Sequence, residues 1–261
     1  MKTIKYFFLL ALTASLVFTS CKKDPDEEPA PITPAATTGS LNLHFENMVD
    51  TNALVLNSQL YTNANGDTFN VTKFDYYISN IKLTKAGVVK YTESNSYHLL
   101  KASDLTTLDI ALSNVPFDTY DGIEFMIGVD SARNVSGAQT GALDPANGMF
   151  WSWSSGYIML KMEGTSPQST SMGGALTFHV GGFSGANNTL KTVSSAFNAE
   201  TAIVSSSITP EIHFAVDLSE MFKNPTTTNF ATTNMIHMPG AAAKTIADNY
   251  ADMFSVEHIH N

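Results

Sequence analysis

Apolar residues recur at every second position along most of this chain of 261 residues, and no other feature limits its fold as strongly. Period-two alternation is typical of a β-strand with one buried face, because successive side chains point to opposite sides of a strand. Turn signals such as Asn65-Gly66-Asp67 separate the segments at spacings expected of a sandwich. The clearest segments carry the series Leu41/Leu43/Phe45, Phe74/Tyr76/Ile78, Ile123/Phe125/Ile127, Leu176/Phe178/Val180 and Ile212/Phe214/Val216. We therefore predict an all-β fold, an antiparallel β-sandwich.

Two places depart from the alternation. After Ile78 the apolar positions continue as Ile81 and Leu83, which have the opposite parity, and this slip predicts a β-bulge at Ser79-Asn80. Near the end of the chain, apolar residues follow one another at helical spacing. They predict one short C-terminal helix over 241–254.

The N-terminal segment has the pattern of an export signal, with a basic head followed by an apolar run. That run is too short to span a bilayer as a helix. Cys21, the one cysteine of the chain, follows directly, so we predict a lipoprotein signal peptide over 1–20 and lipidation at Cys21. Residues 21–40 are charged and then rich in Pro, Ala and Thr, which indicates a flexible tether. One domain over 41–261 remains, and we expect an outer membrane lipoprotein that faces the periplasm or the cell surface.

Charge and motifs argue against two functional classes. The chain carries 24 acidic and 14 basic residues, a net charge of −10, whereas a nucleic-acid binder needs positive charge to neutralise phosphates. Ser79-Asn80-Ile81-Lys82 matches the Ser-x-x-Lys motif by letter, but that motif needs a helix and the context here is a strand. No nucleophile with a neighbouring base can be named from the sequence, so we do not expect an enzyme.

Histidines are the notable chemical group of the chain, which has seven of them. His44, His179 and His213 each lie between two apolar residues of a strand-like series, so alternation places all three on polar faces. Imidazoles on adjacent strands lie close enough to share a metal ion. Three unrelated solvated histidines are the alternative, and spacing alone leaves both interpretations open.

More donor residues lie near the C-terminus. His258 and His260 share one face of an extended segment. Such a His-x-His pair indicates metal binding, although solvated tails also carry it. Met235-Ile236-His237-Met238 combines imidazole and thioether donors, a mixture suited to copper.

Several motifs, in order along 41–223, resemble one known family. The run 74–81, FDYYISNI, looks like the YYISNI strand of the MbnP-like proteins, the methanobactin-associated copper-binding family. The run 128–164, which contains GMFWSWSSGY at 148–157, is similar to the signature block of that family. Phe178-His179-Val180-Gly181-Gly182 follows as the family leads one to expect. Residues 18–21, FTSC, resemble the looser lipobox of Bacteroidota, so the chain resembles a lipoprotein branch of the family.

The resemblance implies a β-sandwich that binds copper through histidines. His44, His179 and His213 are then the leading ligands, with His98, His258 and His260 as additions. In relatives a tryptophan is oxidised to kynurenine by a dihaem partner of the cytochrome c peroxidase type. Trp151 and Trp153 are the candidates for this change here. Neither is followed two residues later by histidine, an arrangement associated with the kynurenine-bearing copper sites, and core packing is their alternative role.

Other functional classes stay open at this point. Exported β-sandwich lipoproteins often bind glycans or peptides, and Trp151, Trp153 and Tyr157 would supply an aromatic platform for such a ligand. An accessory or adhesion module without a small ligand is a third interpretation.

Overall fold

The computed structural model describes residues 36–261 except residues 138 and 153. The expected signal peptide, Cys21 and most of the expected tether therefore lie outside the described residues. Residues Ala36–Asn261 form one compact unit. Its first strand, β1, begins at Thr38, slightly before the expected domain start at residue 41.

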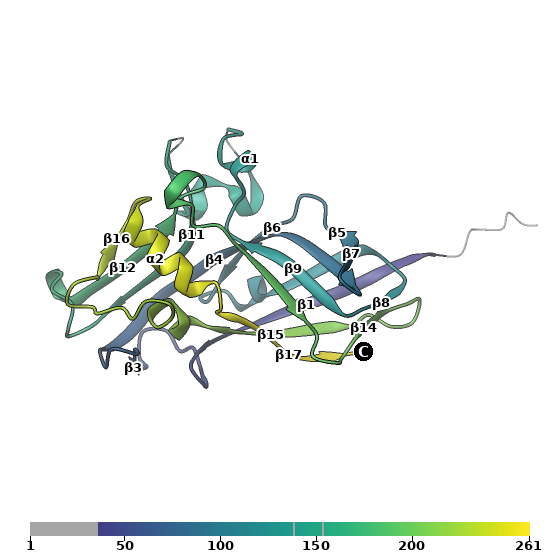
Figure 1. The fold of residues 1–261 in the computed structure, drawn as a ribbon, viewed down its shortest axis with the longest axis horizontal. Helices are drawn as coiled ribbons and strands as arrows, with labels where there is room; N and C mark the ends of the chain where they lie inside the picture. Colours follow the sequence, from purple (N-terminus) through teal and green to yellow (C-terminus); the bar gives the residue numbers. More distant parts are fainter. Residues whose placement is uncertain (1–35, 138, 153) are drawn as a thin grey trace, which may run out of the picture. The chain divides into compact units, whose positions relative to one another are not determined.

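The smaller of the two main sheets has five strands in the order β17-β15-β1-β2, with β7 also paired to β1. In Figure 1 the green strand β15 runs beside the yellow strand β17, which ends near the C-terminus. β15 pairs in parallel with β1 and antiparallel with β17. The strands are β1 (Thr38–Val49), β2 (Asn52–Ala53), β7 (Asp109–Pro116), β15 (Glu211–Asp217) and β17 (Phe254–His260).

The larger sheet has ten strands and is organised around the long strand β4 (Thr68–Lys85). Its main path is β13-β9-β4-β11-β12-β16, and a separate two-stranded sheet joins β14 to β8. The remaining strands are β3 (Tyr61–Thr62), β5 (Val88–Thr92), β6 (Tyr97–Lys101), β8 (Asp118–Tyr120), β9 (Gly122–Ile127), β10 (Phe150–Ser152), β11 (Gly156–Thr165), β12 (Ala175–Gly181), β13 (Lys191–Ala196), β14 (Ala202–Val204) and β16 (Met235–Ile236). The pairings are antiparallel except β1 with β15 and β12 with β16, so the predicted antiparallel sandwich carries two parallel pairs.

The predicted bulge in β4 is confirmed. The pairing of β4 with β9 shifts register between Ser79 and Lys82, and Asn80 has a positive φ of 56°. Asparagine tolerates this left-handed conformation better than most residues. Because the bulge adds a residue, Ile78, Ile81 and Leu83 are all buried despite their mismatched parity.

The core lies between the two sheets. Phe45 of β1 stacks on Phe214 of β15 with ring centroids 5.0 Å apart, and Phe125 of β9 meets these rings edge-on at 6.3 and 5.7 Å. All three side chains are buried, and such aromatic pairs add about 0.5–1.5 kcal/mol each beyond burial. Since Phe45 and Phe214 point into this core, the residues before them, His44 and His213, face outward.

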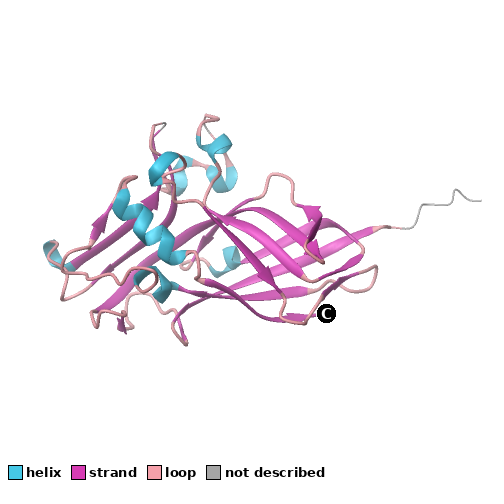
Figure 2. Ribbon diagram, in the orientation of Figure 1, coloured by secondary structure: helices cyan, strands magenta, loops and turns pink. Residues whose placement is uncertain are grey.

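Helices are few and short, as Figure 2 shows. The predicted C-terminal helix is α2 (Ala241–Tyr250), which ends earlier than expected because Phe254 already belongs to β17. The sequence does not predict the second short α-helix, α1 (Ser131–Asn134). The side chain of Asp130 caps its first turn by accepting a hydrogen bond from the Arg133 N–H. The other helical segments are η1 (Leu105–Leu108), η2 (Gly141–Leu143), η3 (Pro145–Asn147), η4 (Met172–Gly174), η5 (Gly185–Asn187) and η6 (Leu218–Phe222). Within the described residues, no helix has the length and apolar character needed to cross a membrane.

Candidate metal centre

Four of the seven histidines gather on the face of the five-stranded sheet that points away from the core. We call His44, His213, His258 and His260 the four-histidine cluster. The ring centroid of His213 lies 4.9 Å from that of His44, 4.3 Å from that of His258 and 5.1 Å from that of His260. The rings of His258 and His260 are 4.8 Å apart. His213 therefore occupies the middle of the cluster.

Strand register explains why these rings meet. His44 of β1 is paired directly with His213 of β15, and His213 is paired in turn with His258 of β17. The next outward residue of β17, His260, is paired with Glu211. The pairing of β15 with β17 shifts register between His213 and Phe214. Because of this shift, core-facing residues of the two strands stay paired with each other beyond the histidines. The sequence prediction that His258 and His260 share one face of an extended segment is confirmed.

Carboxylates orient two of the rings. Nδ1 of His44 donates to Oδ1 of Asp109 at 2.5 Å, and Nε2 of His213 donates to Oε1 of Glu211 at 2.8 Å. Glu46 Oε1 lies 3.7 Å from His44 Nε2. An ionised carboxylate only accepts hydrogen bonds, so each bonded nitrogen carries the proton and the other nitrogen keeps a free lone pair.

Sequence reasoning missed these acidic residues. Glu46 and Glu211 each lie two positions from a cluster histidine, so period-two spacing was a signal that could have identified them. Asp109 had no such signal. It reaches His44 because β7 pairs with β1, and that pairing is a property of the fold.

The central imidazole has an unsatisfied nitrogen. Nδ1 of His213 is buried and has no hydrogen-bond partner, whereas buried polar atoms in proteins nearly always have one. Its side chain is 14% exposed. A lone pair held in this state is suited to a metal ion, which would supply the missing partner.

The nitrogens and oxygens converge closely enough for shared coordination. One ligand atom from each of His213, His258 and His260 lies within 4.8 Å of the other two, and the same holds for His44, Glu46 and His213. His213 belongs to both groups. Neutral imidazole binds copper, zinc and nickel well, so this set of nitrogen and oxygen donors fits an ion of one of these metals.

The other predicted ligands lie elsewhere. His179 is on β12 of the ten-stranded sheet, where it is paired with Lys161, and its Nε2 donates to Glu163 Oε1 at 2.8 Å. Burial lowers the pKa of His179, although the hydrogen bond to Glu163 opposes this shift. The structure therefore brings His44 and His213 together but does not place His179 with them. Alternation gives the face of a strand, but it does not give the neighbours of that strand.

Two more histidines stay outside the cluster. His98 on β6 donates from Nε2 to Glu93 Oε2 at 2.9 Å. His237 follows β16 directly and is exposed, between the exposed Met235 and Met238. Each of these histidines lies on or beside the ten-stranded sheet.

The aromatic side chains of Trp151 and Tyr157 pack against neighbouring residues of the domain. Tyr157 is buried and its hydroxyl donates to the Leu143 carbonyl, so it does not form part of an exposed aromatic platform. Trp151 is half-buried and packs against Gly181, where a Cβ would lie 2.6 Å from Trp151 Cζ3. Trp153 lies outside the described residues.

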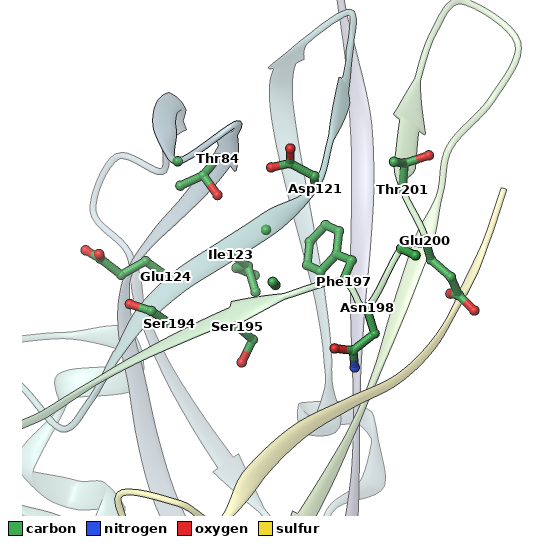
Figure 3. Close-up of a pocket in the computed structure, with 14 residues that line it drawn as sticks. Thr84, Asp121, Ile123, Glu124, Ser194, Ser195, Phe197, Asn198, Glu200 and Thr201 are labelled. Atoms are coloured by element: carbon green, nitrogen blue, oxygen red, sulfur yellow. The ribbon is translucent and has the colours of Figure 1, made fainter.

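A groove of about 730 Å³ lies on another part of the domain. Figure 3 shows that its acidic side chains do not converge, since Glu124 and Glu200 point away from one another. Phe197 is the aromatic residue of the lining, and it is buried. The groove therefore offers neither a metal-binding group nor an aromatic platform.

Comparison with known proteins agrees with the resemblance in sequence. The sequence model of the MbnP family matches residues 38–239. The solved structure of MbnP from Methylosinus trichosporium is similar, with a TM-score of 0.52 and 14% identity over 75% of this chain and 80% of that chain. At this identity the similarity shows a shared fold. No curated protein matches the chain. β17, which carries His258 and His260, follows the matched residues.

Proposed function

The chain belongs to the MbnP family, and on that premise we propose that it is a copper-binding protein without enzymatic activity, used in copper acquisition or handling. The family is associated with methanobactin and copper. The observation that carries the proposal is the four-histidine cluster, with the unpartnered Nδ1 of His213 at its centre.

Each group has a distinct role in this proposal. His213 binds the ion, and His44, His258 and His260 supply the remaining imidazole ligands. Asp109 and Glu211 hold the rings of His44 and His213 in the tautomer that leaves a lone pair for the metal. Such outer carboxylates also raise the basicity of the ligand. Because the ligands must be neutral imidazoles, acid competes with the metal for them.

The test is a copper titration of the purified full chain, with bound metal counted by elemental analysis. One variant replaces His44, His213, His258 and His260 with Ala. Its matched control replaces His98, His179 and His237 with Ala and keeps the cluster. We expect the control to retain bound copper and the cluster variant to lose it. Equal copper content in both variants would refute the assignment of the site.

The N-terminal features belong to the same proposal. Lipidation at Cys21 would anchor the domain to the outer membrane, facing the periplasm or the cell surface. The lone cysteine at the end of the apolar run supports this anchor. A Cys21→Ser variant should leave the membrane fraction or stay unprocessed. Normal processing with membrane retention would contradict the anchor.

Oxidation of a tryptophan by a dihaem cytochrome c peroxidase-like partner is a further element of the proposal. Trp151 packs on Gly181, which follows His179 by two residues on the same strand face. A kynurenine amine formed from Trp151 would therefore lie on the ten-stranded sheet, on the side of His179. Mass spectrometry of the peptide containing Trp151 and Trp153, from cells that express the partner, tests this element. Unmodified tryptophan at both positions would exclude it.

A further inference from the structure

A cavity opens beside β1, between β2 and the η1 segment, and we propose that it binds a small uncharged molecule with an apolar body and one hydrogen-bond acceptor. Its volume is about 380 Å³, and ligand pockets commonly measure about 300–1,000 Å³. This site takes an organic ligand and is independent of copper binding. Four observations support it: a gap in the sheet, an apolar lining, a buried amide nitrogen without a partner, and the charge at the mouth.

The strand β1 has a free edge at the cavity. On this side β1 pairs with β7 as far as His44 and with β2 from Met48 onward, while β15 occupies the other side. Among the described strands, none pairs with β1 between these two positions on the side of β7 and β2. η1 leads directly into β7, and both of its leucines line the cavity. The interruption of the sheet therefore leaves room for a molecule between β1, β2 and η1.

The lining is mostly apolar and reaches from the core to the surface. Phe45 and Leu108 belong to the main core, and Leu54 and Ala102 are partly buried against it. Leu105 lies at the rim, where it is 71% exposed. A ligand in the cavity would cover Leu105 and remove its apolar surface from water, which is favourable in proportion to the area covered.

Asn47 adds a polar group to the lining. Its side chain points into the core, where Oδ1 accepts a hydrogen bond from the Tyr76 hydroxyl at 3.0 Å. Nδ2 of the same amide is buried and has no hydrogen-bond partner among the described residues, although buried polar atoms nearly always have one. The carbonyl oxygen of a bound molecule would supply this partner. A few polar groups in an apolar pocket typically fix the orientation of the ligand.

The mouth of the cavity carries negative charge. Glu46 is exposed and lines the cavity, and the exposed Asp109 bonds to His44, which also lines it. These carboxylates repel an anion that enters the cavity. A neutral carbonyl compound avoids that repulsion, so we assign an uncharged ligand to the site.

The experiment titrates the metal-free full chain with three probes of similar shape. Acetophenone has an aromatic body and a carbonyl oxygen, α-methylstyrene has a methylene group in place of that oxygen, and benzoate carries a negative charge. The methyl resonances of Leu54, Leu105 and Leu108 report binding. We expect saturable shifts with acetophenone and about two- to tenfold weaker binding of α-methylstyrene, because it cannot accept a hydrogen bond. Benzoate should also bind more weakly than acetophenone.

Two variants and a control locate the site. Asn47→Leu removes the donor and nearly keeps the shape, so acetophenone should bind no more tightly than α-methylstyrene, whose retained binding shows an intact cavity. Leu105→Ala removes part of the wall and should weaken both probes at least about threefold. Leu60→Ala is its matched control, because Leu60 is 65% exposed and lies outside the lining. It should change neither affinity.

Each contrary outcome removes one part of the proposal. Absence of saturable shifts with all three probes would overturn the ligand site and leave the copper proposal intact. Equal binding of acetophenone and α-methylstyrene would overturn the role of Asn47. Equal binding of acetophenone and benzoate would overturn the preference for an uncharged ligand. Equal losses in Leu105→Ala and Leu60→Ala would overturn the location of the site.

Discussion

The histidines of the two sheets differ in their neighbours. On the five-stranded sheet, His44, His213 and His258 lie on three consecutive strands and face one another. On the ten-stranded sheet, β4 and β11 separate the strands of His98 and His179. Each of these two histidines instead bonds to one carboxylate, Glu93 or Glu163. The outward position of a histidine is thus common to both sheets, while strand adjacency decides which histidines can share an ion.

The histidines of the two sheets also differ in whether their buried ring nitrogens have hydrogen-bond partners. His179 and His98 each donate to a carboxylate and are not left with a buried, unpartnered nitrogen. His213 donates to Glu211 and still has a buried nitrogen without a partner. An unsatisfied buried polar atom costs about 1–3 kcal/mol. A bound ion at His213 would remove that cost, and this gives the cluster a physical reason to bind metal.

The largest expected effect is the loss of the central ligand. His213→Ala should weaken copper binding about 100-fold or more, because even outer-shell partners of a metal site are worth about 10–100-fold. His179→Ala should leave the affinity unchanged. Isothermal titration of both variants checks the comparison. An equal loss of affinity in the two variants would mean that His213 is no more a copper ligand than His179.

Bound copper should also stabilise the pairing of the C-terminal strand β17 with β15. β17 contributes His258 and His260 to the cluster and pairs with β15, so its detachment would break the site. At free copper about 100 times Kd, amide exchange of residues Phe254–His260 that proceeds through detachment should slow about 100-fold. Hydrogen exchange measured by mass spectrometry checks this, with β6 as an internal control. Unchanged exchange in β17 would show that His258 and His260 are not ligands.

A smaller effect concerns stability at the other sheet. The folded-state pKa of His179 lies below 6.5, mainly because the ring is buried. The fold therefore favours the neutral ring, and this contribution is present above pH 6.5 and is lost as the pH falls through the lower folded pKa. His179→Gln should reduce the loss of metal-free stability on acidification, because the variant has no imidazole to protonate. Urea denaturation at pH 7.5 and pH 5 measures it, and an unchanged pH dependence would contradict the assignment.

The sequence supports much of this account. Alternation predicted the sandwich, the outward direction of His44 and His213, and the bulge at Ser79-Asn80, because these depend on the period of a single strand. It did not predict that β1 pairs with β15, since pairing depends on contacts far apart in the chain. For that reason alternation groups His179 with His44 and His213 and leaves His258 and His260 as additions. The partnership of His44 with Asp109 depends on the same kind of long-range pairing.

Paramagnetic broadening identifies the histidine rings that lie next to a bound Cu(II) ion. Cu(II) added below one equivalent to the full chain, labelled with ¹⁵N in its histidine rings, broadens the resonances of the rings nearest the ion. We expect selective loss of the signals of His44, His213, His258 and His260, while those of His98, His179 and His237 remain sharp. Loss of the His179 signal before those of the four-histidine cluster would contradict this expectation.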